Sequence, residues 1–332
     1  MNVRRLTDFS ALRSADIRSA GNIGASVLEA TDVTVEVPGK TLLHAVSARF
    51  VAGEVTAILG PNGAGKSTLM SVLTGQRQPA MGKVALAGKA LADYPHGALA
   101  RLRACVAQET QVAFDFSVRE VVELGRYPHR RQPVPHESLI AQRAMQATAV
   151  EHLQHRALNT LSGGEKARVH LARALAQVWE PVAGQGDMPV PVAGPHPFTT
   201  EGRVSHEANQ RKIFQARWLL LDEPTAALDL QHQHRMLQLA RSWACRQGAG
   251  VVAVLHDLNQ ALRYSDQCVV LQSGQVVASG KTAEVLTPGL IRQVWDVRAC
   301  PVQTAGLFEG STGGLQYLFE PAPMEGLPDA HF

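Results

Sequence analysis

One stretch of the chain has the residue types and the spacing of a phosphate-binding loop. Gly60-Pro61-Asn62-Gly63-Ala64-Gly65-Lys66-Ser67 fits the pattern G-x-x-x-x-G-K-[ST], and Thr68 follows it. Glycines let the backbone curl so that successive N–H groups point at phosphate oxygens. Lys66 adds a mobile positive charge for the β- and γ-phosphates, and Ser67 offers a hydroxyl to Mg²⁺. The stretch predicts a nucleotide site, with a chance glycine-rich turn as the alternative.

Two carboxylates follow the apolar run WLLL at 218–221. We expect Asp222 to hold Mg²⁺ through the water shell of the ion, and Glu223 to orient or deprotonate an attacking water. Taken alone, an apolar run followed by two acidic residues is weak evidence, because acidic residues commonly end strands. Beside a phosphate loop, the pair favours hydrolysis of the bound nucleotide.

Two further polar residues are candidates for contact with the γ-phosphate. His256 ends a second apolar run, at 250–255, and ligands gather where the strands of a parallel sheet end. The alternative is a histidine that caps the next helix. Gln108 follows the segment CVA and is a candidate ligand of the metal and the γ-phosphate, or else an ordinary surface glutamine.

A second anion site is predicted at 158–168, which reads LNTLSGGEKAR. Ser162 suits the cap of a helix and Glu165 suits its first turn, so bare N–H groups and a positive dipole end face outward. A serine-capped helix explains the cap but not two consecutive exposed glycines. Gly163 and Gly164 would let a backbone approach a large anion closely. The following apolar positions have helical spacing: Ala167, Leu171, Ala174, Leu175 and Val178.

These residues need a sheet whose strands end at one edge. The segments VLEATDVTVEV and AVSARF predict strands, and EVTAIL predicts a buried strand before the phosphate loop and a helix that stops at Gly75. Residues 83–91 predict a hairpin, and about 117–180 are mostly helical with a break at YPHRRQPVP. The apolar runs 217–222 and 250–256 are typical of central parallel strands. The order of elements predicts an α/β architecture.

The organisation of the chain predicts one catalytic cassette with flanking segments. We expect a flexible leader at 1–26, a nucleotide-hydrolysing domain at 27–300 with a helical subdomain at about 110–180, and a tail at 301–332 in which GLQYLF is a candidate strand. Residues 180–216 are rich in Pro and Gly without periodicity. They predict an exposed loop inserted between a helix and a strand.

The composition is that of an ordinary globular protein. Hydrophobic residues make up 45% and charged residues 18%, and the formal charge of +3 is too small to coat nucleic acid. The cysteines have no paired spacing, so we expect a reducing cytoplasm rather than disulfides or zinc. No apolar run approaches the roughly 20 residues that cross a bilayer. At a membrane, we would expect another chain to supply the anchor.

The order of these motifs resembles that of the ATP-binding cassette (ABC) ATPases. GPNGAGKST, AQE, LSGGE, WLLLDEP, AALD and LHD occur in that order over roughly 27–300. The resemblance implies a P-loop fold with a RecA-like core, an antiparallel β subdomain and a helical subdomain that carries LSGGE. It also implies a homodimer, in which each MgATP is held between Lys66 of one copy and Ser162, Gly163 and Gly164 of the other.

The same resemblance implies a role for each remaining motif residue. Gln108 senses the metal and a transmembrane partner, Glu223 is the catalytic base, Asp229 links the two ATP sites, and His256 is the γ-phosphate switch. The chain departs from the family at one point. An aromatic residue usually stacks on adenine before the phosphate loop, and the matching place here is Val37.

A finer resemblance concerns the cargo. LGRYPHR at 124–130, LAQVWEP at 175–181, LDLQHQH at 228–234 and VLHDLNQALRYSD at 254–266 resemble the importer group for iron-siderophores, cobalamin and haem. The last three together most resemble the haem (hemin) import ATPase. This implies two transmembrane permease subunits, a periplasmic solute-binding protein, and a peripheral location on the cytoplasmic face of the cell inner membrane.

Other functions stay open at the level of sequence. The importer group includes ferric-siderophore and cobalamin carriers. A soluble ABC ATPase that acts on nucleic acid or ribosomes usually has two cassettes or a long coiled coil, and this chain has neither. A non-catalytic module is disfavoured because Lys66, Glu223 and His256 occur together. Direct haem binding by His232 and His234 is disfavoured because side chains two apart on a helix do not face one iron.

Overall fold

The main sheet carries the predicted site residues at the ends of its strands. The computed structural model describes residues 26–107, 115–134, 137–179, 216–303 and 314–321. Within these residues the sheet has the order β10-β9-β3-β8-β7-β6, with β10 antiparallel to β9 and the other neighbours parallel. Its strands are β3 (Val55–Leu59), β6 (Arg103–Val106), β7 (Trp218–Leu221), β8 (Gly250–Val254), β9 (Gln267–Gln272) and β10 (Gln275–Lys281).

The three central strands confirm the predicted apolar runs. Every residue of β3, β7 and β8 is buried. Parallel strands that are covered on both faces have no solvent side, so they need apolar residues at consecutive positions rather than at alternate ones. The polar residues that follow β7 and β8 are therefore brought to the same edge as the loop that follows β3.

A second, antiparallel sheet packs on one face of the main sheet, with helix α1 (Lys66–Leu73) in the same core. The apolar cluster on this face joins Leu28 of the small sheet, Leu69 of α1 and Ile58 of β3. The strand order is β2-β1-β4-β5, and the tight turn between β4 and β5 confirms the hairpin predicted at 83–91. The strands are β1 (Val27–Val37), β2 (Lys40–Val51), β4 (Met81–Leu86) and β5 (Lys89–Ala90).

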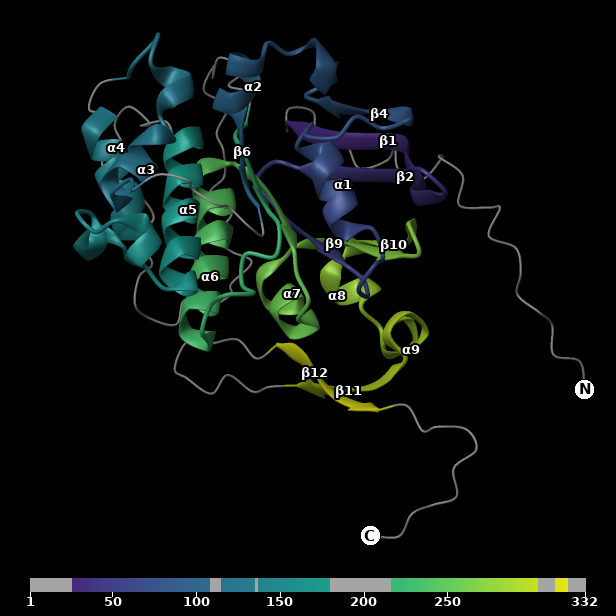
Figure 1. Ribbon diagram of the computed structural model, residues 1–332. Helices are drawn as coiled ribbons and strands as arrows, with labels where there is room; N and C mark the ends of the chain where they lie inside the picture. The colour runs from purple at the N-terminus through teal and green to yellow at the C-terminus, as the bar shows by residue number, and fades with distance from the viewer. Residues whose placement is uncertain (1–25, 108–114, 135–136, 180–215, 304–313, 322–332) are drawn as a thin grey trace, which may run out of the picture.

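The other face of the main sheet is covered by helices. Figure 1 shows α3, α4 and α5 grouped on the opposite side of the molecule from β1, β2 and β4. The helical region predicted at about 117–180 and its break near 127 are both confirmed, because a short 3₁₀ turn, η3 (Tyr127–His129), separates α3 from α4. The helices here are α3 (Val118–Leu124), α4 (Glu137–Ala147), α5 (Gly163–Val178), α6 (Leu230–Gln247) and α7 (Leu258–Tyr264), with α2 (His96–Leu102) at the sheet edge.

Short 3₁₀ turns connect several of these elements. They are η2 (Leu91–Asp93), η4 (Glu151–Leu153) and η5 (Leu158–Thr160). The two sheets and the helical group agree with the predicted α/β fold. No helix in the described part of the chain combines the length and the hydropathy of a membrane span.

Arg126 joins the helical group to the far end of α5. Its guanidinium donates to the backbone oxygens of Ala176 and Trp179 at 2.7 and 2.9 Å, and it forms two bonds to the carboxylate of Glu137 at 2.6 and 3.0 Å. Because Arg126 is buried, removing the Glu137 carboxylate would leave the guanidinium without a counter-charge, which costs up to about 3–5 kcal/mol. The contact holds α5 in place relative to α4.

A hairpin near the C-terminus packs under α7 and α8 (Thr282–Val285). It consists of β11 (Val297–Gln303) and β12 (Leu315–Pro321), so the strand predicted in GLQYLF is confirmed. Tyr317 donates its hydroxyl proton to the Leu286 oxygen at 2.6 Å. Since β11 follows directly on α9 (Pro288–Trp295) and crosses residue 300, we propose to count the hairpin with the predicted domain 27–300. The leader at 1–25 and residues 180–215 of the predicted insertion lie outside the described residues.

Candidate functional site

The phosphate loop lies between β3 and α1, as the sequence predicts. Gly60 and Gly65 have φ values of 146° and 102°, which favour glycine. A Cβ on Gly60 would collide with the backbone oxygen of Leu271, and one on Gly65 would lie 2.7 Å from the Leu43 side chain. Both glycines are therefore required by the turn and by the packing around it.

Lys66 folds back over this loop. Its ammonium donates to the backbone oxygens of Gly60 at 2.9 Å and Pro61 at 3.0 Å. Burial lowers the pKa of Lys66, while the charges of Glu223 and Asp222 act in the opposite direction. The two carbonyls thus hold the ammonium at the mouth of the loop, where a phosphate would replace them as the partner.

Ser67 and Asp222 meet beside the loop and fit a Mg²⁺ site. The Ser67 hydroxyl donates to Oδ1 of Asp222 at 3.3 Å. Burial raises the pKa of Asp222, and the neighbouring Glu223 raises it further, while Ser67, Lys66 and His256 lower it. A hydroxyl and a carboxylate are the hard oxygen ligands that Mg²⁺ accepts alongside water. The third predicted ligand, Gln108, lies outside the described residues.

Glu223 and His256 are in direct contact. Nε2 of His256 lies 2.8 Å from Oε1 of Glu223, and the histidine side chain is 47% exposed against 16% for the glutamate. Glu223 has a φ of 50°, a left-handed conformation that costs a non-glycine residue about 1–3 kcal/mol. The end of β7 therefore turns abruptly and directs this carboxylate toward the end of β8.

The alternative role for His256, as a helix cap, is excluded by the structure. The N-cap of α7 is Asp257, whose Oδ1 accepts from the backbone N–H groups of Asn259 at 2.7 Å and Gln260 at 3.1 Å. His256 is thus free of the capping role. Its ring is available at the same sheet edge as the phosphate loop.

Ser162 caps α5 as predicted. Its Oγ accepts from the backbone N–H of Glu165 at 3.3 Å, and Oε2 of Glu165 accepts from the backbone N–H of Ser162 at 2.8 Å. These bonds to Ser162 lower the pKa of Glu165. Gly163 is exposed, whereas a Cβ on Gly164 would lie 3.1 Å from the Ala227 oxygen. Gly164 therefore has a packing role within its own chain that the sequence alone does not reveal.

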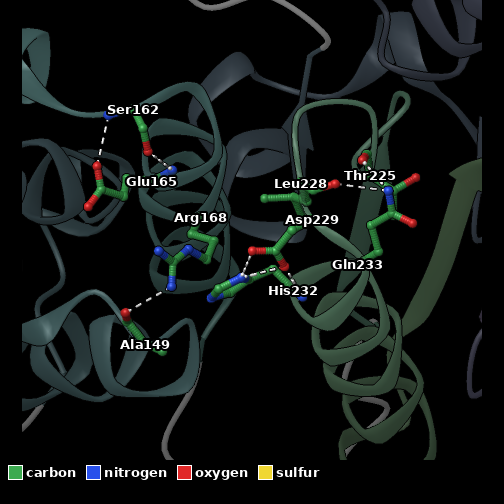
Figure 2. Close-up of polar contacts among 9 residues, drawn as sticks. All are labelled: Ala149, Ser162, Glu165, Arg168, Thr225, Leu228, Asp229, His232 and Gln233. Carbon is green, nitrogen blue, oxygen red and sulfur yellow. Dashed lines mark hydrogen bonds and ion pairs between the residues drawn. The ribbon is translucent and has the colours of Figure 1, made fainter.

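Asp229 lies beside the start of α5 and caps α6 (Figure 2). Its carboxylate accepts from the backbone N–H of His232 at 2.9 Å and contacts Nδ1 of the same histidine at 2.7 Å. Both contacts lower the pKa of Asp229. His234 instead bonds to the Tyr264 hydroxyl at 2.7 Å, so the two histidines do not face one ligand.

The partnership of His232 with Asp229 escapes sequence reasoning, although a signal exists. A polar residue three positions after an N-cap aspartate has the spacing of a capping box. His232 stands at that spacing but differs from the usual Glu or Gln.

The two predicted anion sites lie on opposite faces of the main sheet within one chain. Helix α1 shares its core with Ile58, whereas α5 shares a separate core with Ala57 of the same strand. Because successive residues of a strand point to opposite faces, a single chain keeps Lys66 and Ser162 apart. Figure 1 likewise shows α1 and α5 well separated.

Comparisons with known proteins agree with this geometry. The family model described as ABC transporter matches residues 43–179. The hemin import ATP-binding protein HmuV of Gloeobacter violaceus is 45% identical over 79% of this chain and 84% of its own length. The HmuV protein of Rhodopseudomonas palustris is 42% identical over 81% and 88%.

Solved structures share the fold. The dimeric bacterial ABC transporter cassette MJ0796 has a TM-score of 0.59 and 24% identity, and it covers 77% of this chain and 98% of its own. The same cassette in a post-hydrolysis state, bound to ADP and Pi, gives the same values.

Proposed function

The chain belongs to the ATP-binding proteins of ABC transporters, and we propose from this premise that it is the ATP-hydrolysing subunit of a hemin import complex. The assignment of hemin as the cargo rests on one observation, the 45% identity with a hemin import ATP-binding protein over 79% of the chain. The chemistry rests on the edge of the main sheet, where Lys66, Glu223 and His256 follow the neighbouring strands β3, β7 and β8.

The residues of the phosphate loop bind ATP in this proposal. Backbone N–H groups of residues 62–68 donate to the phosphates, and the Lys66 ammonium exchanges its two carbonyl partners for phosphate oxygens. Ser67, Asp222 and Gln108 would hold Mg²⁺, which when bound neutralises charge on the β- and γ-phosphates. The raised pKa of Asp222 supports this, since a carboxylate in an unfavourable site gains most from a cation.

Glu223 is the general base of the proposed reaction. Its carboxylate accepts the proton of the attacking water, and its contact with His256 orients it toward the sheet edge. His256 presents its half-exposed ring at the position of the γ-phosphate. The strained backbone of Glu223 fits this role, because strain of this kind gathers where a side chain must be aimed.

A second copy of the chain completes each ATP site. Gly163 and Gly164 offer N–H groups, and Ser162 offers its hydroxyl, at the start of α5, on the far face of the sheet from Lys66. Two copies related by a two-fold axis bring the α5 terminus of each to the phosphate loop of the other, with Asp229 between the sites. Closure around two ATP molecules then supplies the mechanical step.

The other proposed partners are those that hemin import requires. Two transmembrane permease subunits change conformation when the ATPase dimer closes, and a periplasmic solute-binding protein delivers hemin to them. The chain would then lie on the cytoplasmic face of the inner membrane, held by the permease.

The test uses the full chain in vesicles that contain the permease subunits. MgATP hydrolysis is measured with the binding protein empty or loaded with hemin, a ferric siderophore or cobalamin. We expect hemin alone to stimulate hydrolysis. Stimulation by a siderophore or cobalamin instead would reassign the cargo, and a chain that hydrolyses no ATP in any of these conditions contradicts the function as a whole.

A further inference from the structure

The loop that joins Glu223 to Asp229 is the shortest covalent link between the two predicted half-sites. It leaves β7 after Asp222 and ends where Asp229 caps α6. Within the loop the backbone hydrogen bonds are long: the Ala226 N–H donates to the Glu223 oxygen at 3.3 Å, and the Leu228 N–H donates to the Thr225 oxygen at 3.2 Å. The loop therefore depends on side chains outside it for a fixed position.

Gln233 supplies that support from the first turns of α6 (Figure 2). Its amide nitrogen donates to the Leu228 oxygen at 2.9 Å and to the Thr225 oxygen at 3.2 Å. Its amide oxygen accepts from the side chain of Gln260 at 2.8 Å. The amide thus uses both of its protons and its oxygen, and the two carbonyls fix which atom is the nitrogen.

Gln260 links this contact to the other catalytic candidate. It is 7% exposed and lies in the first turn of α7, where its backbone N–H donates to Asp257. Asp257 directly follows His256, whose ring contacts Glu223. Glu223 and His256 are therefore linked twice. Their side chains contact each other directly, and the segments that follow them are joined through the hydrogen bond between Gln233 and Gln260.

The opposite side of the loop faces the start of α5. A Cβ on Gly164 would lie 3.1 Å from the Ala227 oxygen and 3.5 Å from the Leu228 side chain. The loop is therefore enclosed between the helix terminus that serves the partner's ATP and the amide of Gln233. A shift of the loop would move both half-sites of the chain at once.

We propose that Gln233 is a positioning residue for ATP hydrolysis, which holds residues 225–228 so that Glu223 and Asp229 keep a fixed separation. Gln260 acts with it by fixing the orientation of its amide. This inference rests on the proposed function, since it assigns Gln233 to the same hydrolytic site. Gln233 itself touches neither nucleotide nor water in this role.

The positioning role of Gln233 is tested by substitution in the full chain. Gln233→Met removes all three side-chain hydrogen bonds and keeps nearly the same side-chain length. Gln233→Glu removes the two donated hydrogen bonds but keeps an acceptor for Gln260. We expect each to lower kcat for ATP hydrolysis about tenfold, because displacing a catalytic group by about 1 Å can cost about a hundredfold and the loop keeps its own backbone hydrogen bonds. Binding of a fluorescent ATP analogue should change less than twofold, since the phosphate loop is untouched.

A matched control lies on the same helix. Gln238→Met makes the same chemical change at a half-buried position five residues further along α6, and it should leave kcat unchanged. If Gln233→Met does not fold, Gln233→Glu carries the test, because a charged residue is tolerated at a partly exposed helix position. A control that loses as much kcat as the Gln233 variants would overturn the proposal.

A double-mutant cycle separates positioning from general damage to the fold. Because the two amides act as one unit, the variant with both Gln233→Met and Gln260→Met should lose no more kcat than Gln233→Met alone. Losses that multiply would refute the shared role. A wild-type chain without ATPase activity contradicts the proposed function. An active wild type whose Gln233 variants keep full kcat contradicts only the positioning role of Gln233.

Discussion

At the scale of single residues, the candidate site holds carboxylate charge at a cost in stability. Asp222 and Glu223 are neighbours, and burial together with that neighbour raises the pKa of Asp222. Glu223 adds a strained backbone. Both features are unfavourable for stability, and in the proposed function both serve the binding and hydrolysis of MgATP. Activity and stability should therefore separate when these carboxylates are replaced.

Asp222→Asn should stabilise the empty chain while it removes Mg²⁺-dependent hydrolysis. The raised pKa means that the folded state disfavours the charged form, so the cost is present at pH 7 and disappears below the unfolded pKa near 4. We expect Tm at pH 7 to rise by about 2 °C, a small effect because the carboxylate is partly solvated. Calorimetry measures this. The exposed Asp93→Asn should change neither property, and a lower Tm for Asp222→Asn would refute the argument.

Glu223→Gln should keep ATP binding and dimer closure and lose turnover. The amide cannot accept the proton of the attacking water, and loss of a general base typically lowers the rate by about 10²–10⁴. Phosphate release measures turnover, and gel filtration with ATP measures the dimer. Hydrolysis at the wild-type rate would show that Glu223 is not the base.

The candidate site residues can be proposed from the sequence, but several of their contacts cannot be predicted from it. Residue type and spacing predict Lys66 and Ser67 within their loop, and the cap by Ser162, because these depend on local backbone geometry. The contact of Glu223 with His256 joins residues 33 positions apart, and it depends on β7 and β8 being neighbours. Spacing along the chain carries no record of that neighbourhood.

At the scale of elements, α5 transmits the position of the Ser162 terminus to the rest of the chain. Its second half is almost entirely buried, and its final carbonyls are held by Arg126. Apolar spacing predicts the helix and its buried stripe correctly. The grip of Arg126 escapes prediction because it links residues 50 and 53 positions apart through backbone oxygens, which every residue type possesses.

His170 makes the stability of this helix sensitive to pH. It is buried, and its Nδ1 has no hydrogen-bond partner among the described residues. Burial, with Arg173 and Lys166 nearby, lowers its pKa to about 4. Since the folded pKa lies below the unfolded value, stability is fully present above pH 6.5 and is lost as pH falls toward 4.

We expect His170→Leu to remove about 2–3 kcal/mol of the loss in unfolding free energy between pH 7 and pH 4. Urea unfolding at a series of pH values measures the slope. His96→Leu is the control, because an exposed histidine is solvated in both states. An unchanged slope in His170→Leu would assign the acid sensitivity to other groups.

At the scale of the whole molecule, the main sheet separates two cores and two half-sites. The small sheet and α1 share one core with one face of the sheet, and the helical group shares the other. The loop from Glu223 to Asp229 passes from the phosphate side toward the start of α5, so in the proposed dimer each chain contributes one half of two different ATP sites. A rigid sheet with a half-site on either face is suited to a two-fold dimer in which each copy completes the other.

Mixing two inactive variants tests whether the sites are shared. Lys66→Ala disables the phosphate loop, and Gly163→Asp places a carboxylate opposite the phosphates while it favours the start of α5 through the helix dipole. Each homodimer should be inactive. In a mixed dimer both changes fall on one site, and the other site has an intact phosphate loop and an intact α5 terminus. Random pairing makes half of the dimers mixed, so hydrolysis should recover to about a quarter of the wild-type rate. A mixture that stays inactive, while calorimetry shows both variants folded, would mean that each chain completes its own ATP site.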